Sequence, residues 1–243
     1  MPNAASPTPA PRGQPETSEF ARDMLACLER TPHEISPKYF YDAAGSRLFE
    51  RICGLPEYYV TRTELEILSR DIHHMAELIG PDAEVVEFGA GSLVKARLLL
   101  QALQNPRRFI AIDISAEHLH AATTQLQREF PPVEIIPVVG DFSDADSLPP
   151  LPPASRAGRR GGFFPGSTLG NFNHDEARRF LHSASRLLAG GGMLIGIDLV
   201  KTPSLLHQAY NDSAGVTAAF NLNLLVRANR ELGTNFNVDS FAH

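Results

Sequence analysis

The sequence predicts an α/β fold in which helices cover both faces of a mostly parallel sheet. From residue 83 the chain alternates between apolar runs of strand length and segments with helical spacing, a pattern typical of parallel sheets. A Gly-x-Gly turn, at Gly89 and Gly91, follows the first of these runs. The alternation ends near residue 200, and the segments on either side of it have helical patterns, which predicts a small second domain built from flanking pieces.

The elements of the sheet region follow from hydrophobic periodicity and turn residues. Strands are expected at 83–88, 109–114, 133–139, 163–164 and 193–200, and helices at 93–103, 116–130 and 173–188. The last helix opens on an Asn-x-x-Glu capping pattern at Asn173. The run 193–200 is so continuously apolar that we expect a strand buried on both faces. Residues 149–162 are expected to form a surface loop, with Arg159 and Arg160 as solvated charges.

The flanking segments supply the remaining elements. Helices are expected at 18–28, 46–53, 61–68, 203–210 and 214–232, the third capped by Thr61 or Thr63 and the last closed by Gly233. The first sixteen residues hold five prolines and are expected to be a disordered tail. The expected domains are a cofactor-binding domain at 62–200 and a partial substrate domain made of 17–61 and 201–243.

Composition narrows the class of protein. The 243 residues include 22 basic and 28 acidic side chains, for a net charge of −6, which argues against a protein that binds nucleic acid through a basic face. No apolar run approaches the ~20 residues of a membrane span, and no signal peptide is visible. Two cysteines make no disulfide framework. We therefore expect a reduced, cytoplasmic, monomeric enzyme acting on a small molecule, with no nucleic-acid or membrane partner.

The ends of three expected strands carry residues suited to an adenosine. Gly89 lets the backbone approach a ligand, Asp113 can accept both ribose hydroxyls, and Asp141-Phe142 offers an acceptor beside an aromatic wall. Each has a plain alternative: a tight turn for the glycines, a helix cap for Asp113 and a turn residue for Asp141. Val94 stands where the dinucleotide fingerprint has its third glycine, so S-adenosyl-L-methionine is favoured over a nicotinamide cofactor.

Other polar residues are candidates for the second substrate. Asn171, in a loop after the fourth strand, has both donors and an acceptor with which to hold an amino acid, although a loop-capping role is the alternative. Tyr41, Tyr58, Tyr59 and Tyr210 lie outside the sheet region, where they either pack in a core or donate to a carboxylate. The nine histidines show no third ligand at metal spacing, and we expect no metal site.

With these residues assembled, the chain resembles the histidine-specific Nα-methyltransferases of the ergothioneine pathway, from Ser36 to His243. The resemblance is carried by six segments, several of them long and specific to the family: PKYFYDAAGSRLFERICGLPEYYVTRTELEIL, EFGAGSLVKARLLL, GDF, PGSTLGNF, GIDLVK and AYNDSAGVTAAFNLNLL. It implies a Rossmann-like class I methyltransferase sheet. It also implies that S-adenosyl-L-methionine methylates the α-amine of L-histidine three times to give hercynine.

The resemblance also implies roles for individual residues. The cofactor would be contacted by Gly89, Lys95, Asp113, Asp141 and Phe142. Tyr41 would lie near the reacting centre, and the amino-acid end of the substrate would be held by Tyr58, Asn171 and Tyr210. No residue is assigned as a general base.

The resemblance also implies that the family continues beyond His243 with a Glu-x-Ser element that reads the imidazole. No residue in this chain is therefore assigned to imidazole recognition. Two alternatives stay open: a related N-methyltransferase acting on another amino acid or small molecule, and a non-catalytic cofactor-binding fragment. An oxidoreductase is disfavoured by the missing third glycine.

Overall fold

The computed structural model describes residues 18–144, 148–155 and 158–243, so the tail expected at 1–16 lies outside the described residues. The chain divides into two compact units: the first ends at Tyr39, and the second runs from Phe40 to His243. In the first unit, α1 (Glu19–Leu28) begins as expected: the hydroxyl of Ser18 accepts a hydrogen bond from the Ala21 N–H at 3.2 Å. The first unit also holds a stacked aromatic pair, Phe20 and Tyr39, with ring centroids 4.6 Å apart.

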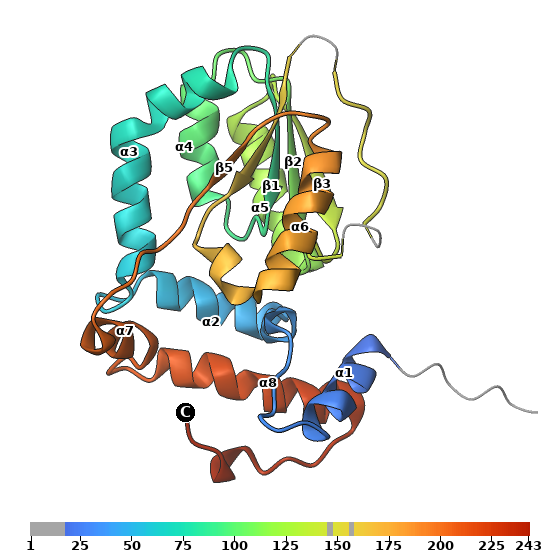
Figure 1. The fold of residues 1–243 in the computed structure, drawn as a ribbon, viewed down its shortest axis with the longest axis vertical. Helices are drawn as coiled ribbons and strands as arrows, with labels where there is room; N and C mark the ends of the chain where they lie inside the picture. Colours follow the sequence, from blue (N-terminus) through green and yellow to red (C-terminus); the bar gives the residue numbers. More distant parts are fainter. Residues whose placement is uncertain (1–17, 145–147, 156–157) are drawn as a thin grey trace, which may run out of the picture. The chain divides into compact units, whose positions relative to one another are not determined.

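The second unit is built on a five-stranded sheet with the order β3-β2-β1-β4-β5 (Figure 1). Its strands are β1 (Glu84–Phe88), β2 (Arg108–Asp113), β3 (Glu134–Val139), β4 (Arg160–Phe164) and β5 (Met193–Ile195). All four pairings are parallel, as the alternation of strands and helices predicts. Every strand therefore ends at the same edge of the sheet.

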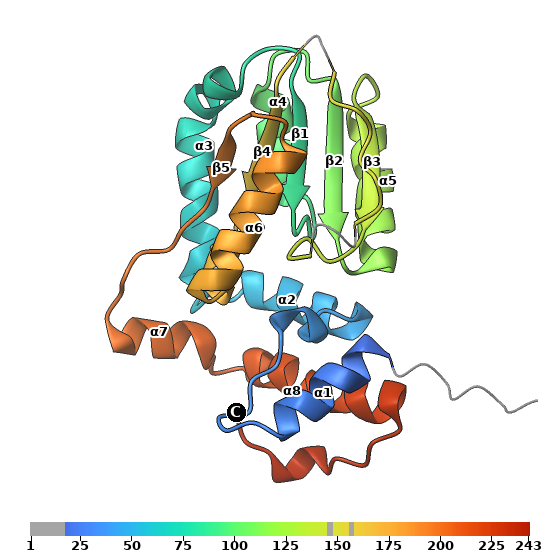
Figure 2. The ribbon, with the colours of Figure 1, turned by 45° about the vertical axis from the view of Figure 1, so that its right-hand side comes forward.

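Helices cover both faces of the sheet (Figure 2). On one face lie α3 (Tyr59–Ile79), α4 (Val94–Ala102) and α5 (Ala116–Glu129), packed on side chains such as Val85 and Phe109. The other face carries α6 (His174–Leu187), packed on Val86 and Ile110. Successive residues of a strand point to opposite faces, which explains why neighbouring valines of β1 enter different cores. The capping box expected at Asn173 is present.

Beyond the carboxyl ends of the strands lie three further helices, α2 (Ala43–Cys53), α7 (Pro203–Tyr210) and α8 (Val216–Leu232) (Figure 2). Together with the start of α3 they enclose a third hydrophobic cluster, which includes Tyr58, Ala209 and Phe220. The described residues also contain three short 3-10 helices: η1 (Pro37–Phe40), η2 (Thr168–Asn171) and η3 (Val238–Ser240). No helix in the described part of the chain combines the length and the apolar character that crossing a membrane requires.

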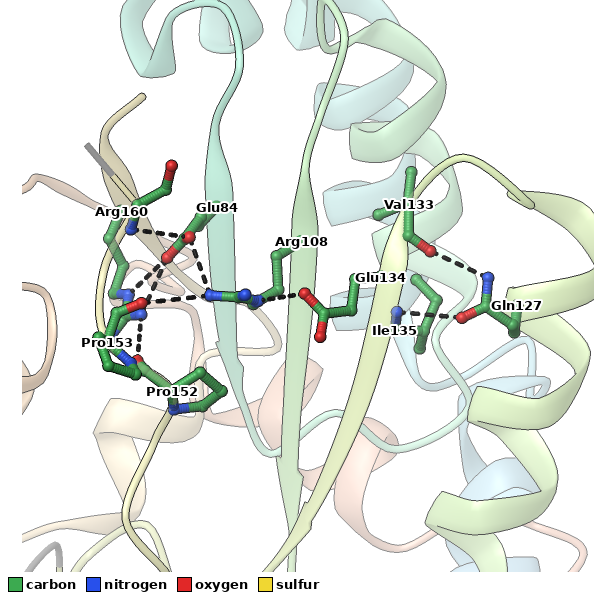
Figure 3. Close-up of polar contacts among 10 residues, drawn as sticks. Glu84, Arg108, Gln127, Val133, Glu134, Ile135, Pro152, Pro153 and Arg160 are labelled. Atoms are coloured by element: carbon green, nitrogen blue, oxygen red, sulfur yellow. Dashed lines mark hydrogen bonds and ion pairs between the residues drawn. The ribbon is translucent and has the colours of Figure 1, made fainter. Parts of the chain in front are cut away.

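The loop expected at 149–162 is present in the described residues up to Arg159, but residues 160–162 belong to β4 and the expectation that Arg160 is solvated is wrong. β4 starts at Arg160, whose side chain is buried and whose Nη2 lies 2.9 Å from Oε2 of Glu84 on β1 (Figure 3). Arg108 of β2 pairs with the other oxygen of the same carboxylate at 3.0 Å. The Glu84 carboxylate, whose negative charge permits the burial of Arg160, belongs to a neighbouring strand and is far from Arg160 in the sequence. Arg159 is exposed, as expected.

Two further expectations differ from the structure. The strand expected at 193–200 is limited to the three residues of β5, and its expected burial on both faces is wrong, because Leu199 is 75% and Val200 101% exposed. The helix expected at 61–68 runs from Tyr59 to Ile79 and follows Tyr58, so neither threonine caps it. For the expected strand, the apolar content of residues 193–200 alone indicated burial. In the described structure β5 pairs only with β4.

Candidate active site

The Gly-x-Gly turn follows β1 at the carboxyl edge of the sheet. Gly89 has a φ of +73°, and its N–H donates to the carbonyl of Ile112 at 2.9 Å. A Cβ at position 89 would stand 3.2 Å from the Phe142 ring. Two residues predicted as cofactor contacts, Gly89 and Phe142, are thus brought together, and the absence of a side chain leaves the backbone open to a ligand.

Asp113 ends β2 and holds two segments of backbone. Its Oδ2 accepts from the Gly91 N–H at 3.0 Å, and its Oδ1 accepts from the Ser115 N–H at 2.9 Å, next to the start of α5. The N-cap residue of α5 is Ser115, so Asp113 braces the turn before the helix and the helix-cap alternative is not borne out. Each carboxylate oxygen can accept more than one hydrogen bond, so these two bonds leave capacity for hydroxyl groups of a ligand.

Asp141 and Phe142 follow β3. The Asp141 carboxylate accepts from the Ser143 N–H at 2.9 Å, which is the turn role that was its alternative. The Phe142 ring packs against the rings of Phe164 at 5.6 Å and Phe180 at 5.8 Å. Phe142 is therefore fixed as a wall at the strand ends.

The tyrosines predicted near the substrate form one cluster. Tyr58 and Tyr210 lie with ring centroids 5.8 Å apart, and a hydrogen bond links their side chains. Burial, followed by the nearby Tyr210, raises the pKa of Tyr58. Burial, followed by the charges of Cys53 and Asp113, raises the pKa of Tyr41. Tyr41 therefore connects this cluster electrostatically to the end of β2, and both phenols stay protonated donors at neutral pH.

Asn171 ends η2, in the loop after β4, and its side chain is exposed. Within the described ranges, no hydrogen bond joins it to the tyrosine cluster. Its neighbour Phe172 contacts the Phe142 ring at 6.3 Å, which ties this loop to the end of β3.

Lys95, a predicted cofactor contact, lies in the first turn of α4 and is ion-paired with a residue that the sequence analysis did not single out. Its Nζ is 2.5 Å from Oε2 of Glu64 on α3. Glu64 also accepts from the Gly166 N–H, at the start of the loop after β4. The only sequence signal for Glu64 is its place in the long segment 37–68 of the family resemblance, since a glutamate on a helix is usually solvated.

Glu87, in β1, is the second candidate site residue that the sequence patterns did not indicate. Its side chain is 2% exposed, and Oε2 has no hydrogen-bond partner among the described residues. Burial raises the pKa of this carboxyl well above its usual range; Lys95 opposes the shift, whereas Asp113 and Glu64 add to it. A buried carboxyl of this kind can keep its proton or pair with a cationic group.

A third group, around Asp198, ties the chain after β5 to the start of α3. The Tyr59 hydroxyl donates to the Asp198 carboxylate, and Lys201 Nζ lies 2.8 Å from Oδ1 of the same group. The Asp198 N–H donates to Ser167 Oγ at 3.0 Å, in the loop that leads to Asn171. This role was missed because 193–200 was expected to be a buried strand.

Comparison with known proteins identifies the family of this chain. Residues 20–243 match the family model described as histidine-specific methyltransferase, SAM-dependent. The histidine N-alpha-methyltransferases of Mycobacterium tuberculosis and Mycolicibacterium smegmatis are each 43% identical over 226 residues, covering 91% of this chain and 68% of the relative. Ergothioneine biosynthesis protein 1 of Neurospora crassa is 34% identical over 206 residues, covering 83% of this chain and 23% of that protein. The chain belongs to the SAM-dependent, histidine-specific methyltransferase family.

Proposed function

We propose that this protein transfers methyl groups from S-adenosyl-L-methionine to the α-amine of L-histidine, three times in succession, and so produces hercynine for ergothioneine biosynthesis. The observation that carries the proposal is the 43% identity, over 91% of the chain, to relatives named histidine N-alpha-methyltransferase. The site at the strand ends supports it, because residues suited to a cofactor and to an amino acid meet at one edge of the sheet.

The residues present fit S-adenosyl-L-methionine. The unpartnered oxygen of Glu87 suits the cationic amino-acid end of the cofactor, and Asp113 keeps acceptor capacity for the ribose. The Phe142 ring next to Gly89 suits the adenine. Asp141 and Lys95 complete the set of residues that would hold the cofactor. When bound, the cofactor supplies an electrophilic methyl group on a sulfonium centre.

The protein's own contribution is to align the substrate amine and to favour its neutral form. Tyr58, Asn171 and Tyr210 would hold the amino-acid end, with Tyr41 beside the reacting nitrogen. Because burial keeps Tyr41 and Tyr58 protonated, these phenols donate hydrogen bonds rather than remove protons. The amine loses its proton to water, and alignment supplies the rate gain. The faces of the tyrosine rings favour the cationic product by about 0.5 to 2 kcal/mol.

The substrate domain in this proposal combines residues 17–61 and 201–243. Its support, which concerns only the part from residue 40 onward, is the third hydrophobic cluster, in which Phe40, Tyr58 and Ile52 pack with Leu205 and Phe220. An ion pair adds to it: Arg230 Nη2 of α8 lies 2.6 Å from the carboxylate of Asp42, the N-cap residue of α2.

Incubation of the purified protein with labelled S-adenosyl-L-methionine and a panel of amino acids tests the proposal. Label in histidine supports it. Label only in another amine favours the related N-methyltransferase, and cofactor binding with no transfer favours the non-catalytic alternative. Either of these results contradicts the proposed function.

A further inference from the structure

One carboxylate at the sheet edge, that of Glu64, contacts several segments that are far apart in the sequence. Its Oε1 and Oε2 accept from the Gly166 N–H at 2.7 and 2.9 Å. Its Oε2 also lies 2.5 Å from Lys95 Nζ, and the side chain is only 14% exposed. A hydrogen bond to an ionised acceptor is about twice as strong as one between neutral groups, so Glu64 is a strong link between α3, α4 and the loop after β4.

The Glu64 carboxylate fits beside Gly196, which has no side chain to occupy the same space. Gly196 follows β5, and a Cβ at this position would stand 1.8 Å from Oε1 of Glu64. The Gly196 N–H donates to the carbonyl of Phe164 at 2.9 Å, which fixes this backbone against the end of β4. Position 196 therefore has to lack a side chain for Glu64 to reach Gly166.

The loop that Glu64 holds has a demanding backbone conformation. Gly166 has a φ of +87° and Ser167 a φ of +57°. A non-glycine residue in the left-handed region is strained and persists only where its surroundings fix it. The Gly166 N–H donates to Glu64, and the Asp198 N–H donates to the Ser167 hydroxyl oxygen at 3.0 Å. Four residues further along the chain is Asn171.

We propose that Glu64 is a positioning residue, which fixes the loop from Pro165 to Asn171 against Lys95 and so sets the place of Asn171. This inference rests on the proposed function, in which Asn171 holds the amino-acid end of the substrate. Glu64 itself acts through the Gly166 N–H and touches no reacting group. Lys95 holds the carboxylate of Glu64 in the orientation that reaches Gly166.

Hydrogen–deuterium exchange of the Gly166 amide, together with the KM for histidine, tests this role. In Glu64→Ala the amide loses its acceptor, and we expect exchange at Gly166 to quicken and the histidine KM to rise about tenfold, while kcat changes less. Glu64→Gln keeps one acceptor oxygen, so both effects should be several times smaller. Glu66→Ala, an exposed glutamate on the same helix, is the matched control and should change neither quantity.

Gly196→Ala tests the same contact without touching Glu64. The added methyl group displaces the carboxylate, so exchange at Gly166 should quicken as it does in Glu64→Ala. In the double variant the two changes should not add, because both remove one contact. Full additivity, or unchanged exchange in Glu64→Ala, would overturn the inference.

Failure of the inference is distinguishable from failure of the proposed function, because amide exchange requires no substrate. If the wild-type protein does not methylate histidine, the proposed function is contradicted. If the Gly166 amide nevertheless exchanges faster in Glu64→Ala than in wild type, the positioning of the loop by Glu64 is still supported. Normal methylation with unchanged exchange and an unchanged histidine KM in Glu64→Ala would contradict the inference alone.

Discussion

The rings of Tyr58 and Tyr210 meet edge to face, with centroids 5.8 Å apart and planes at 85°. Tyr58 directly precedes α3 and is 6% exposed, whereas Tyr210 ends α7 and is 48% exposed. A buried ring that precedes the sheet domain in the sequence thus contacts a half-exposed ring that follows it. The pair brings the two flanking segments together at the place where the resemblance puts the substrate's amino-acid end.

Removing the Tyr58 hydroxyl should weaken histidine binding. In Tyr58→Phe we expect the histidine KM to rise about fivefold, which corresponds to ~1 kcal/mol for one hydrogen bond, and Tyr210→Phe should give a similar rise. Steady-state kinetics with histidine as the varied substrate measures both. Tyr39→Phe, which removes a hydroxyl bonded to Asp23, is the control. An equal rise in the control would show that the effect is not specific to the site.

Adding a methyl group at Gly89 should weaken cofactor binding. The φ of +73° and the Cβ distance of 3.2 Å to the Phe142 ring both oppose Gly89→Ala. Gly91→Ala shares the positive φ, but a Cβ there would have no atom within 4 Å. Calorimetric titration with the cofactor should therefore show a larger loss for position 89. Equal losses would mean that backbone strain alone, and not the ring contact, decides the effect.

Replacing Glu87 should change how stability depends on pH. Its pKa is raised in the folded state, so the folded protein binds more protons than the unfolded chain, and the free energy of unfolding falls as pH rises. The loss begins near the ordinary pKa of glutamate and continues until the raised pKa is reached. Glu87→Gln should flatten this decline at pH values above the ordinary pKa of glutamate.

Chemical denaturation at a series of pH values measures the effect of Glu87→Gln. The exposed Glu66→Gln is the control and should leave the pH profile of wild type unchanged. Parallel profiles for wild type and Glu87→Gln would contradict the raised pKa.

Breaking the ion pair at the amino ends of the strands should affect stability and not the site. Arg160 donates to Glu84 through Nε and Nη2 at 3.0 and 2.9 Å (Figure 3). Arg160→Met leaves a buried carboxylate short of one partner and should lower the free energy of unfolding by about 3 kcal/mol or more. Arg159→Met, next to it and exposed, should change it by under ~0.5 kcal/mol. Equal effects of the two variants would contradict the buried pair.

Features encoded by local patterns were predictable from the sequence. The strands before Gly89 and Asp113 and the capping box at Asn173 each depend on a few adjacent residues, and the structure confirms them. Parallel strands must end at one edge, so the meeting of Gly89, Asp113 and Asp141 followed from the order of the elements.

Features that depend on distant partners were not predictable in this way. Arg160 lies in a stretch rich in proline and glycine, and only Glu84 on another strand explains its burial. Glu64 has the pattern of a solvated helix residue, and its role is set by Lys95 and the Gly166 N–H. Leu199 is apolar yet 75% exposed, because burial depends on what covers a strand and not on the strand's own composition.

The proposed function requires that methyl groups go to the α-nitrogen of histidine. The most direct test is tandem mass spectrometry of the product formed from the purified protein, L-histidine and excess S-adenosyl-L-methionine. We expect a product with three methyl groups, all on the α-nitrogen, and an unmodified imidazole ring. Methyl groups on the ring, or no methylated histidine from protein that binds the cofactor, would contradict it.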